Sequence, residues 1–267
     1  MTYQGIDTVA RIMPSKAKIL ADNGISFVGR YLVPSVMSKY LSESEAGTLR
    51  DAGLAILLLW ETTARRALSG TAAGQADGAM ARELAKSLEI PTGCAVYFCV
   101  DFEAQINEYA KIQQYLDAAK KAVDPYRCGV YGKAGLINCI SADVYMQCVA
   151  WSYGDVSPKN NIYQYESQYG ANAKALAAKV GFDVDLDSCE DLRAAGLWLP
   201  DAKPEPTHWY DDTVRWAIKE GIVAGPTIED ARPEDFATRA EVMQMFRNYN
   251  RRFEAEDVKT AGGLISD

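Results

Sequence analysis

The sequence has a single histidine, His208, and its six cysteines include no CxxC pair. Ser-His-Asp and Cys-His catalysis both use a histidine as the base. Zinc sites of the Cys/His type need closely spaced ligands. One histidine in the whole chain therefore argues against both chemistries. We expect any catalysis to use carboxylates, and we expect no metal and no other cofactor.

Long hydrophobic runs and an excess of basic residues are also missing. The longest apolar run, residues 54–60, is far shorter than the ~20 residues that cross a bilayer. The N-terminus shows no basic segment followed by an apolar one, as a secretory signal would. The net charge is −8, which leaves no basic footprint for nucleic acid. We expect no membrane and no nucleic-acid partner, and a chain that starts in the cytoplasm.

Two modules are indicated by the distribution of charge and proline. From Glu205 onward there are 13 acidic and 8 basic residues, so that −5 of the net −8 lies in the last quarter. The segment LPDAKPEPTH (199–208) holds three prolines and is typical of a linker. We predict a domain at 1–198, a linker at 199–207, a small α-helical module at 208–255 and a tail at 256–267.

The first module alternates short apolar runs with helical patterns, which include 71–89 and 105–122. The runs that predict strands are 4–8, 25–32, 54–61, 94–103, 127–132, 145–152, 161–166 and 182–187. This βα alternation predicts an α/β fold with a parallel sheet, and eight strands favour an irregular (β/α)8 TIM-type barrel. The connection between the sixth and seventh strands is too brief for a full helix. An open doubly wound sheet is the alternative.

Active sites of such barrels lie at the carboxyl ends of the strands. Polar or aromatic residues recur at the predicted strand ends, and they form a candidate ring around one site. In chain order they are Asp7, Tyr31, Glu61, Asp101 with Glu103, Tyr131, Trp151, Gln164 and Asp185.

Asp101 and Glu103 are the most informative members of this ring. As strand residues i and i+2 they would share a face, with Cα atoms roughly 6.6 Å apart. Two carboxylates so close raise one pKa toward neutrality. Glycoside cleavage needs an acid of this kind and a second carboxylate. A metal site that also uses Asp7 and Asp185, or a structural ion pair, would give the same spacing.

Other members of the ring are open to two interpretations. Glu61 is predicted to contact substrate or to pair with Arg30. Trp151 is predicted to stack on a sugar or to pack in the core. Asp187 shares the face of Asp185, and it is predicted to support the substrate site or to cap a helix. Cys99 points inward and is predicted to fill the barrel.

The motifs GIDT, YFCVDFE, YQY (163–165) and VDLD (184–187) resemble the family 25 glycoside hydrolases. With GRYL near residue 30, the chain is more similar to the related bacterial glycoside hydrolase-like barrels, over roughly residues 3–195. Family 25 enzymes are muramidases that cut peptidoglycan. The resemblance implies that Glu103 is the general acid and that Asp101 assists or orients the N-acetyl group. It also implies positioning roles for Asp7 and Asp185, and a sugar groove lined by Gln164, Tyr31, Tyr131 and Trp151.

The C-terminal module resembles an S-layer homology repeat through its HW opening, GIVAG, and TRAE at 238–241. Such repeats bind secondary cell-wall polymers, which implies binding roles for Arg239 and Trp209. A single copy could assemble into a homo-oligomer that raises avidity for the wall. A packing appendage is the alternative.

Both resemblances point to bacterial cell-wall carbohydrate. We predict a peptidoglycan-cleaving, N-acetylmuramidase-like glycosidase, of the kind a phage or prophage endolysin provides. It would remain cytoplasmic until it is released to the wall. The alternatives are a non-catalytic wall-glycan-binding protein and a metal-dependent hydrolase.

Overall fold

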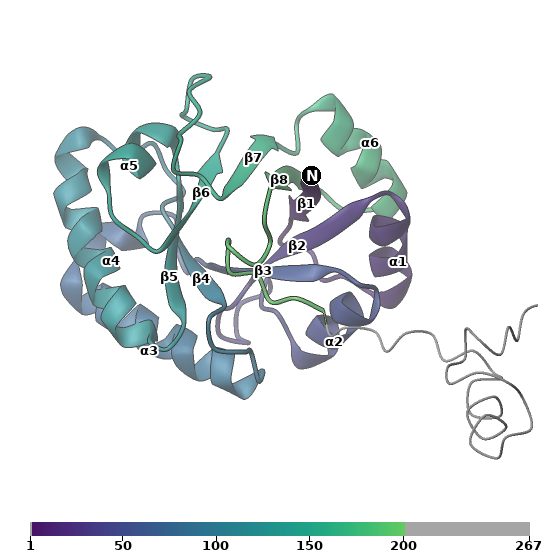
Figure 1. Cartoon of the computed structure of the whole chain (residues 1–267), viewed down its shortest axis with the longest axis horizontal. Helices are drawn as coiled ribbons and strands as arrows, with labels where there is room; N and C mark the ends of the chain where they lie inside the picture. Colours follow the sequence, from purple (N-terminus) through teal and green to yellow (C-terminus); the bar gives the residue numbers. More distant parts are fainter. Residues whose placement is uncertain (1, 201–267) are drawn as a thin grey trace, which may run out of the picture. The chain divides into compact units, whose positions relative to one another are not determined.

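The structure is a computed structural model that describes residues 2–200. The predicted helical module and tail lie outside the described residues, as do Trp209, Arg239 and most of the predicted linker. Eight strands form a closed barrel in chain order, as predicted (Figure 1). They are β1 (Tyr3–Asp7), β2 (Ile25–Tyr31), β3 (Ala55–Trp60), β4 (Ala95–Cys99), β5 (Arg127–Gly132), β6 (Val144–Cys148), β7 (Ile162–Glu166) and β8 (Asp185–Cys189).

One strand runs against the prediction of a wholly parallel sheet. β8 is antiparallel to both of its neighbours, β7 and β1, whereas the other neighbouring pairs are parallel. Its range is also later than the predicted 182–187, since it begins at Asp185. The antiparallel strand β8 begins at the end of the barrel where β7 finishes. Its first residue therefore lies at the same mouth of the barrel as the last residue of β1. Asp185 therefore reaches the predicted place from the opposite end of its strand.

Helices cover the outside of the barrel, with α3, α4 and α5 on one side and α1, α2 and α6 on the other (Figure 1). The α-helices are α1 (Pro14–Asp22), α2 (Glu43–Asp51), α3 (Thr71–Ser87), α4 (Tyr109–Val123), α5 (Ala134–Cys139) and α6 (Ala171–Val180). Two short 3-10 helices, η1 (Arg66–Ser69) and η2 (Ile106–Glu108), precede α3 and α4. Both helical predictions are confirmed, and no helix joins β6 to β7. Among residues 2–200 no helix is long and apolar enough to span a membrane.

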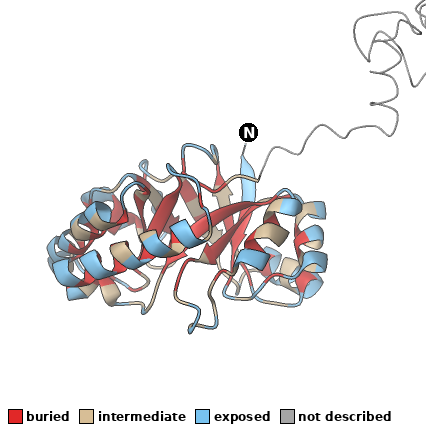
Figure 2. Cartoon of the chain, turned by 90° about the horizontal axis from the view of Figure 1, so that it is seen from below, coloured by how far each residue is buried: buried red, intermediate tan, exposed pale blue. Residues whose placement is uncertain are grey.

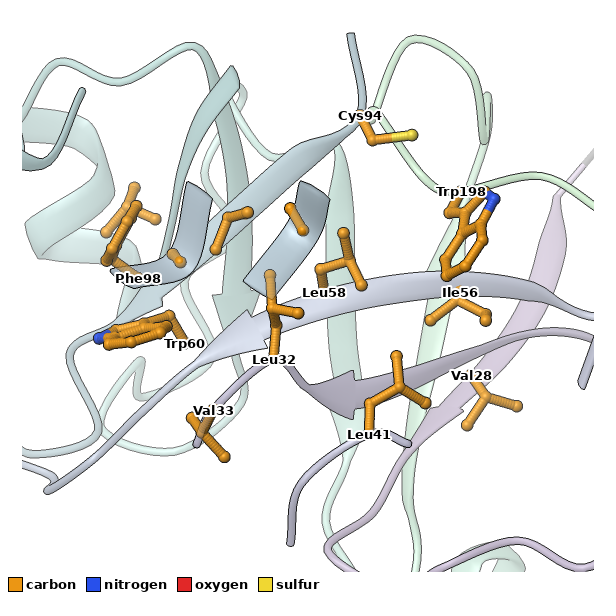
Figure 3. Packing of buried hydrophobic residues seen from close by; sticks show 14 of the residues in the cluster. Val28, Leu32, Val33, Leu41, Ile56, Leu58, Trp60, Cys94, Phe98 and Trp198 are labelled. Carbon is orange, nitrogen blue, oxygen red and sulfur yellow. The ribbon is translucent and has the colours of Figure 1, made fainter. Parts of the chain in front are cut away.

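Strand residues alternate between two cores, as the period of two requires. Outward side chains such as Val28, Ile56 and Phe98 pack under the helices, where Trp198 also joins them (Figure 3). Most strand residues are buried, while most exposed residues lie on the outer helix surfaces and loops and at the start of β1 (Figure 2). Inward side chains such as Phe27 and Tyr97 fill the barrel. The cross-section is therefore packed solid below the mouth.

The far end of the barrel is closed by the segment that follows β8. The Ala95 N–H donates to the Gly196 carbonyl, and Trp198 pairs antiparallel with Ile56. The Tyr97 hydroxyl donates to the Ala195 carbonyl at 2.6 Å. Leu197 completes an apolar floor. Only the opposite end, where β1 to β7 finish and β8 starts, is left for a site.

Candidate active site at the barrel mouth

Asp7 is the deepest carboxylate of the mouth, at 7% exposure. It ends β1 and lies opposite Gly29 on β2 and Asp185 on β8. Gly29 leaves the room that this side chain occupies, because a Cβ there would lie 2.6 Å from the Asp7 Cβ. The GRYL segment is therefore needed for the acid site and not only for the strand.

Gln164 links the two aspartates. Its Nε2 donates to Asp7 Oδ2 at 2.7 Å and to Asp185 Oδ2 at 3.4 Å. The Tyr131 hydroxyl donates to Gln164 Oε1 at 3.2 Å, which fixes the orientation of the amide. The backbone N–H of Gln168 donates to Asp185 Oδ1 at 2.5 Å. Residues predicted from four different strands, β1, β5, β7 and β8, thus form one hydrogen-bonded group.

This group can hold a proton near neutral pH. Burial raises the pKa of Asp7 to about 7; the charge of Asp185 adds to that effect, and the hydrogen bond from Gln164 opposes it. Burial also raises the pKa of Asp185, against the hydrogen bond from the Gln168 N–H. The group at the bottom of the mouth can therefore keep a proton near pH 7 and supply or accept it there.

Tyr31 ends β2, and Glu61 and Asp101 follow the ends of β3 and β4 at the same mouth. Lys39, in the loop after β2, forms an ion pair with Glu61 and lies 4.0 Å above the centre of the Tyr31 ring. Burial is the main cause that raises the pKa of Asp101; the Glu61 charge adds to it and Lys39 opposes it. A cation thus lies among the carboxylates and moderates their repulsion.

The predicted pairing of Glu61 with Arg30 is wrong. Arg30 follows Gly29 and precedes Tyr31, so its side chain lies on the outer face of β2. There its Nε donates to Glu45 Oε1 at 2.8 Å, and both side chains are wholly buried. Lys39 takes the expected role of Arg30, and sequence reasoning missed it because it belongs to an irregular loop.

The strand geometry predicted for Asp101 and Glu103 is also wrong, because β4 ends at Cys99. Asp101 is half-buried within the mouth, whereas Glu103 is exposed at its edge. Glu103 Oε1 accepts a hydrogen bond of 2.7 Å from the hydroxyl of Tyr153. The two carboxylates thus occupy different environments, one inside the acid group and one at the surface where a large substrate can reach it.

Three further predicted residues have definite places. Trp151 is half-buried and lies in the loop after β6, not within the strand.

Asp187 lies one strand layer below the acid group, beside Gly5 and Gln164, with 0% exposure. Neither of its carboxylate oxygens has a hydrogen-bond partner, and burial raises its pKa well above the usual value. Direct substrate contact by Asp187 is therefore excluded, and so is capping of a helix. Cys99 is buried inside the barrel, as predicted.

Within residues 2–200 no group of three or more histidine, cysteine or acidic side chains is arranged to hold a metal ion. For the deepest pair, Asp7 and Asp185, the N–H donors of the Gln164 amide occupy the side where a cation would have to bind. The metal-dependent alternative has no ligand set in this part of the chain.

Residues 18–189 match the family described as Rv2525c-like, glycoside hydrolase-like domain, and the chain belongs to that family. The expected similarity to bacterial glycoside hydrolase-like barrels is thereby confirmed.

A curated relative and two solved structures agree with this assignment. The uncharacterized protein YbfG of Bacillus subtilis (strain 168) is 27% identical over 225 residues, which cover 74% of this chain but only 30% of YbfG. The Tat-secreted protein Rv2525c of Mycobacterium tuberculosis, solved with L-tartrate, is 22% identical with a TM-score of 0.61 over 74% of this chain and 98% of that one. An uncharacterized B. stearothermophilus protein is 20% identical with a TM-score of 0.55, over 73% and 100% of the chains. At these identities the two structures show the shared fold.

Proposed function

We propose that the barrel is a glycosidase that cleaves bacterial cell-wall glycan, with N-acetylmuramidase-like specificity. The observation that carries the proposal is the acid mouth. Three of its carboxyls, Asp7, Asp101 and Asp185, have raised pKa values, and Glu103 lies exposed at its edge. Glycoside hydrolysis needs a proton donor for the leaving oxygen and a carboxylate for the positive charge that develops on the sugar.

We take the roles from the resemblance to the family 25 glycoside hydrolases, and exposure and depth support them. Glu103 is the carboxyl that a polymer can reach without entering the barrel, and we assign it as the general acid. Asp101, half-buried and facing inward, is placed to stabilise positive charge or to orient the N-acetyl group. Asp7 and Asp185 hold the proton of the group below, and Gln164 fixes their geometry. Tyr31, Tyr131 and Trp151 supply aromatic walls.

The rim of the mouth suits a long saccharide. Exposed apolar side chains lie on the loops that leave the mouth ends of β1, β2, β4, β6 and β7. They include Val9, Val36, Ile106, Tyr153 and Tyr169. Sugar rings present apolar C–H faces that pack on such side chains, while their hydroxyls and amides meet polar groups. Exposed apolar side chains on several of these loops favour a substrate longer than one sugar unit.

The experiment is the release of new reducing ends from purified peptidoglycan of a Gram-positive bacterium, with and without a chelator. We expect release in both conditions. Loss with the chelator would support the metal-dependent alternative. Protein that sediments with the wall but releases no ends from several walls would contradict the enzyme and leave a glycan-binding protein.

For the C-terminal module we propose wall binding through Arg239 and Trp209, by a repeat of the S-layer homology type that also joins several chains. The support is the sequence resemblance alone, since these residues lie outside those that the structure describes. Sedimentation with wall that carries its secondary polymer, and with wall stripped of it, tests this role. Equal sedimentation of wild type and Arg239→Ala on both walls would contradict it.

A further inference from the structure

The loop between β6 and β7, residues 149–161, is held in place from below by two buried polar side chains. Ser152 Oγ donates to the Cys148 carbonyl at 2.6 Å and accepts from the Ala134 N–H at 3.0 Å. Gln147 Nε2 donates to the Asp155 carbonyl at 2.7 Å, and Gln147 Oε1 accepts from the Ser157 N–H at 2.6 Å. Both ends of the segment 148–157 are thus tied to the barrel.

The same segment contains local backbone strain. Trp151 and Tyr153 have φ values of 55° and 51°, in the left-handed region that side chains other than glycine rarely adopt. Glu89 is the one other non-glycine residue with positive φ in the part of the chain that the structure describes. Such conformations persist where the surroundings impose them, and they concentrate at functional sites. Here the buried anchors supply that constraint.

The strained segment presents Tyr153 to solvent beside the general acid. Tyr153 is 81% exposed. Its hydroxyl donates to Glu103 Oε1 at 2.7 Å, across 50 positions of sequence. Hydrogen bonding to Glu103 raises the pKa of the Tyr153 phenol. Nothing in the packing of the barrel requires this side chain, so the contact with Glu103 needs another explanation.

We propose that Tyr153 is a positioning residue for Glu103 and that its exposed ring forms one wall of the saccharide site. The hydroxyl holds one oxygen of the acid, which leaves the other free to face the glycosidic oxygen. The ring packs on the apolar face of a bound sugar. This inference rests on the proposed glycosidase function.

A first test needs no activity. In protein labelled with 13C at the tyrosine ring carbon that bears the hydroxyl, the Tyr153 resonance is the one absent from Tyr153→Phe. We expect its titration midpoint to fall in Glu103→Gln, because the neighbouring negative charge is lost. A midpoint that does not change in Glu103→Gln would overturn the contact, whatever the protein does to peptidoglycan.

A second test separates the hydroxyl from the ring by kinetics on a soluble peptidoglycan fragment. We expect Tyr153→Phe to lower kcat by about three- to tenfold with little change in KM, since one hydrogen bond to the acid is lost. Tyr153→Ala should add a rise in KM of about two- to tenfold, since the wall is lost. Tyr3→Phe, at the far end of the barrel, is the matched control and should match wild type.

The results separate the two proposals. A wild-type kcat for Tyr153→Phe would overturn the positioning role. So would a further loss of kcat when Tyr153→Phe is added to Glu103→Gln, because the hydroxyl would then not act through Glu103. A wild type that releases no ends while the Tyr153 midpoint still responds to Glu103→Gln would contradict the glycosidase function and leave the contact itself established.

Discussion

The two ends of the barrel interior are built from the same strands but differ in chemistry. At the mouth, burial and the charges of Asp185 and Asp101 raise the pKa of Asp7, and burial is the main cause that raises the pKa values of Asp101 and Asp185. At the floor, Phe27 lies in one apolar cluster with Leu197 of the closing segment. Along β1 these two layers are only two positions apart, at Gly5 and Asp7. The floor stabilises the barrel, and that stability allows like charges to be held together at the mouth.

The largest expected effect is on the rate of glycan cleavage, from a substitution of Glu103 at the edge of the mouth. Glu103→Gln should lower the rate of glycan cleavage by about 10²- to 10⁴-fold, which is the usual contribution of a general acid. Its melting temperature should equal that of wild type, because Glu103 is exposed. The matched control is Glu190→Gln, an exposed carboxylate just beyond the far end of β8. Equal rates for the two variants would remove Glu103 from the mechanism.

A substitution at the floor should instead lower the stability of the barrel. Phe27 is wholly buried, and its ring fills the space that the absent side chain of Gly5 leaves. Phe27→Ala should lower the free energy of unfolding by about 3–5 kcal/mol through lost contacts and a cavity. Urea denaturation measures this loss. A loss below about 1 kcal/mol would mean that the floor does not stabilise the barrel as described.

Asp187, which lies opposite Gly5 in the layer below the acid group, should show its effect in the pH dependence of stability. Its pKa is raised in the folded protein, so folding retains a proton that the unfolded chain releases above about pH 4. This stabilisation is complete below that pH and is lost as the pH rises toward the folded-state pKa. The Asn side chain of Asp187→Asn cannot ionise. As the pH rises, the free energy of unfolding of this variant should therefore increase relative to that of wild type by up to about 1.4 kcal/mol per pH unit.

Unfolding free energies of both proteins between pH 4 and pH 8 give this difference directly. Because only its slope with pH is interpreted, any constant cost of the buried amide cancels. A difference that stays constant over the whole range would show that Asp187 does not carry the extra proton.

The smallest effect is expected from the cation at the mouth. Lys39 lowers the pKa of Asp101 against the effects of burial and Glu61. Lys39→Met keeps an unbranched side chain but removes the charge, and the Asp101 pKa should rise. Titration of the labelled Asp101 carboxyl by NMR measures this, with Lys18→Met as the control, since Lys18 pairs with Asp22 on an exposed helix face. An unchanged or lower Asp101 pKa would contradict the electrostatic role of Lys39.

The sequence predicted the strands and most of the mouth because period-two alternation and strand ends are local signals. It did not predict the direction of β8, since an apolar run carries no record of the strand it pairs with. Asp185 reached its predicted neighbour, Asp7, in spite of that error. Arg30 could have been placed on the outer face from alternation alone.

The loop residues of the site were beyond such reasoning. Lys39 and Tyr153 reach the carboxylates from loops whose course depends on tertiary anchors such as Ser152 and Gln147. The DxE motif marked Asp101 and Glu103 as a pair, but the end of β4 at Cys99 gave them different environments. A motif specifies residue types, while the backbone that follows it decides what each residue contacts.

The most direct measurement is the identity of the sugar at the newly formed reducing end. Peptidoglycan digested by the wild-type protein would be reduced with borohydride, and the fragments analysed by mass spectrometry. An N-acetylmuramidase predicts reduced N-acetylmuramic acid at the end of each fragment, present for wild type and absent for Glu103→Gln. Reduced N-acetylglucosamine, or no reduced fragment at all, would contradict the proposed specificity.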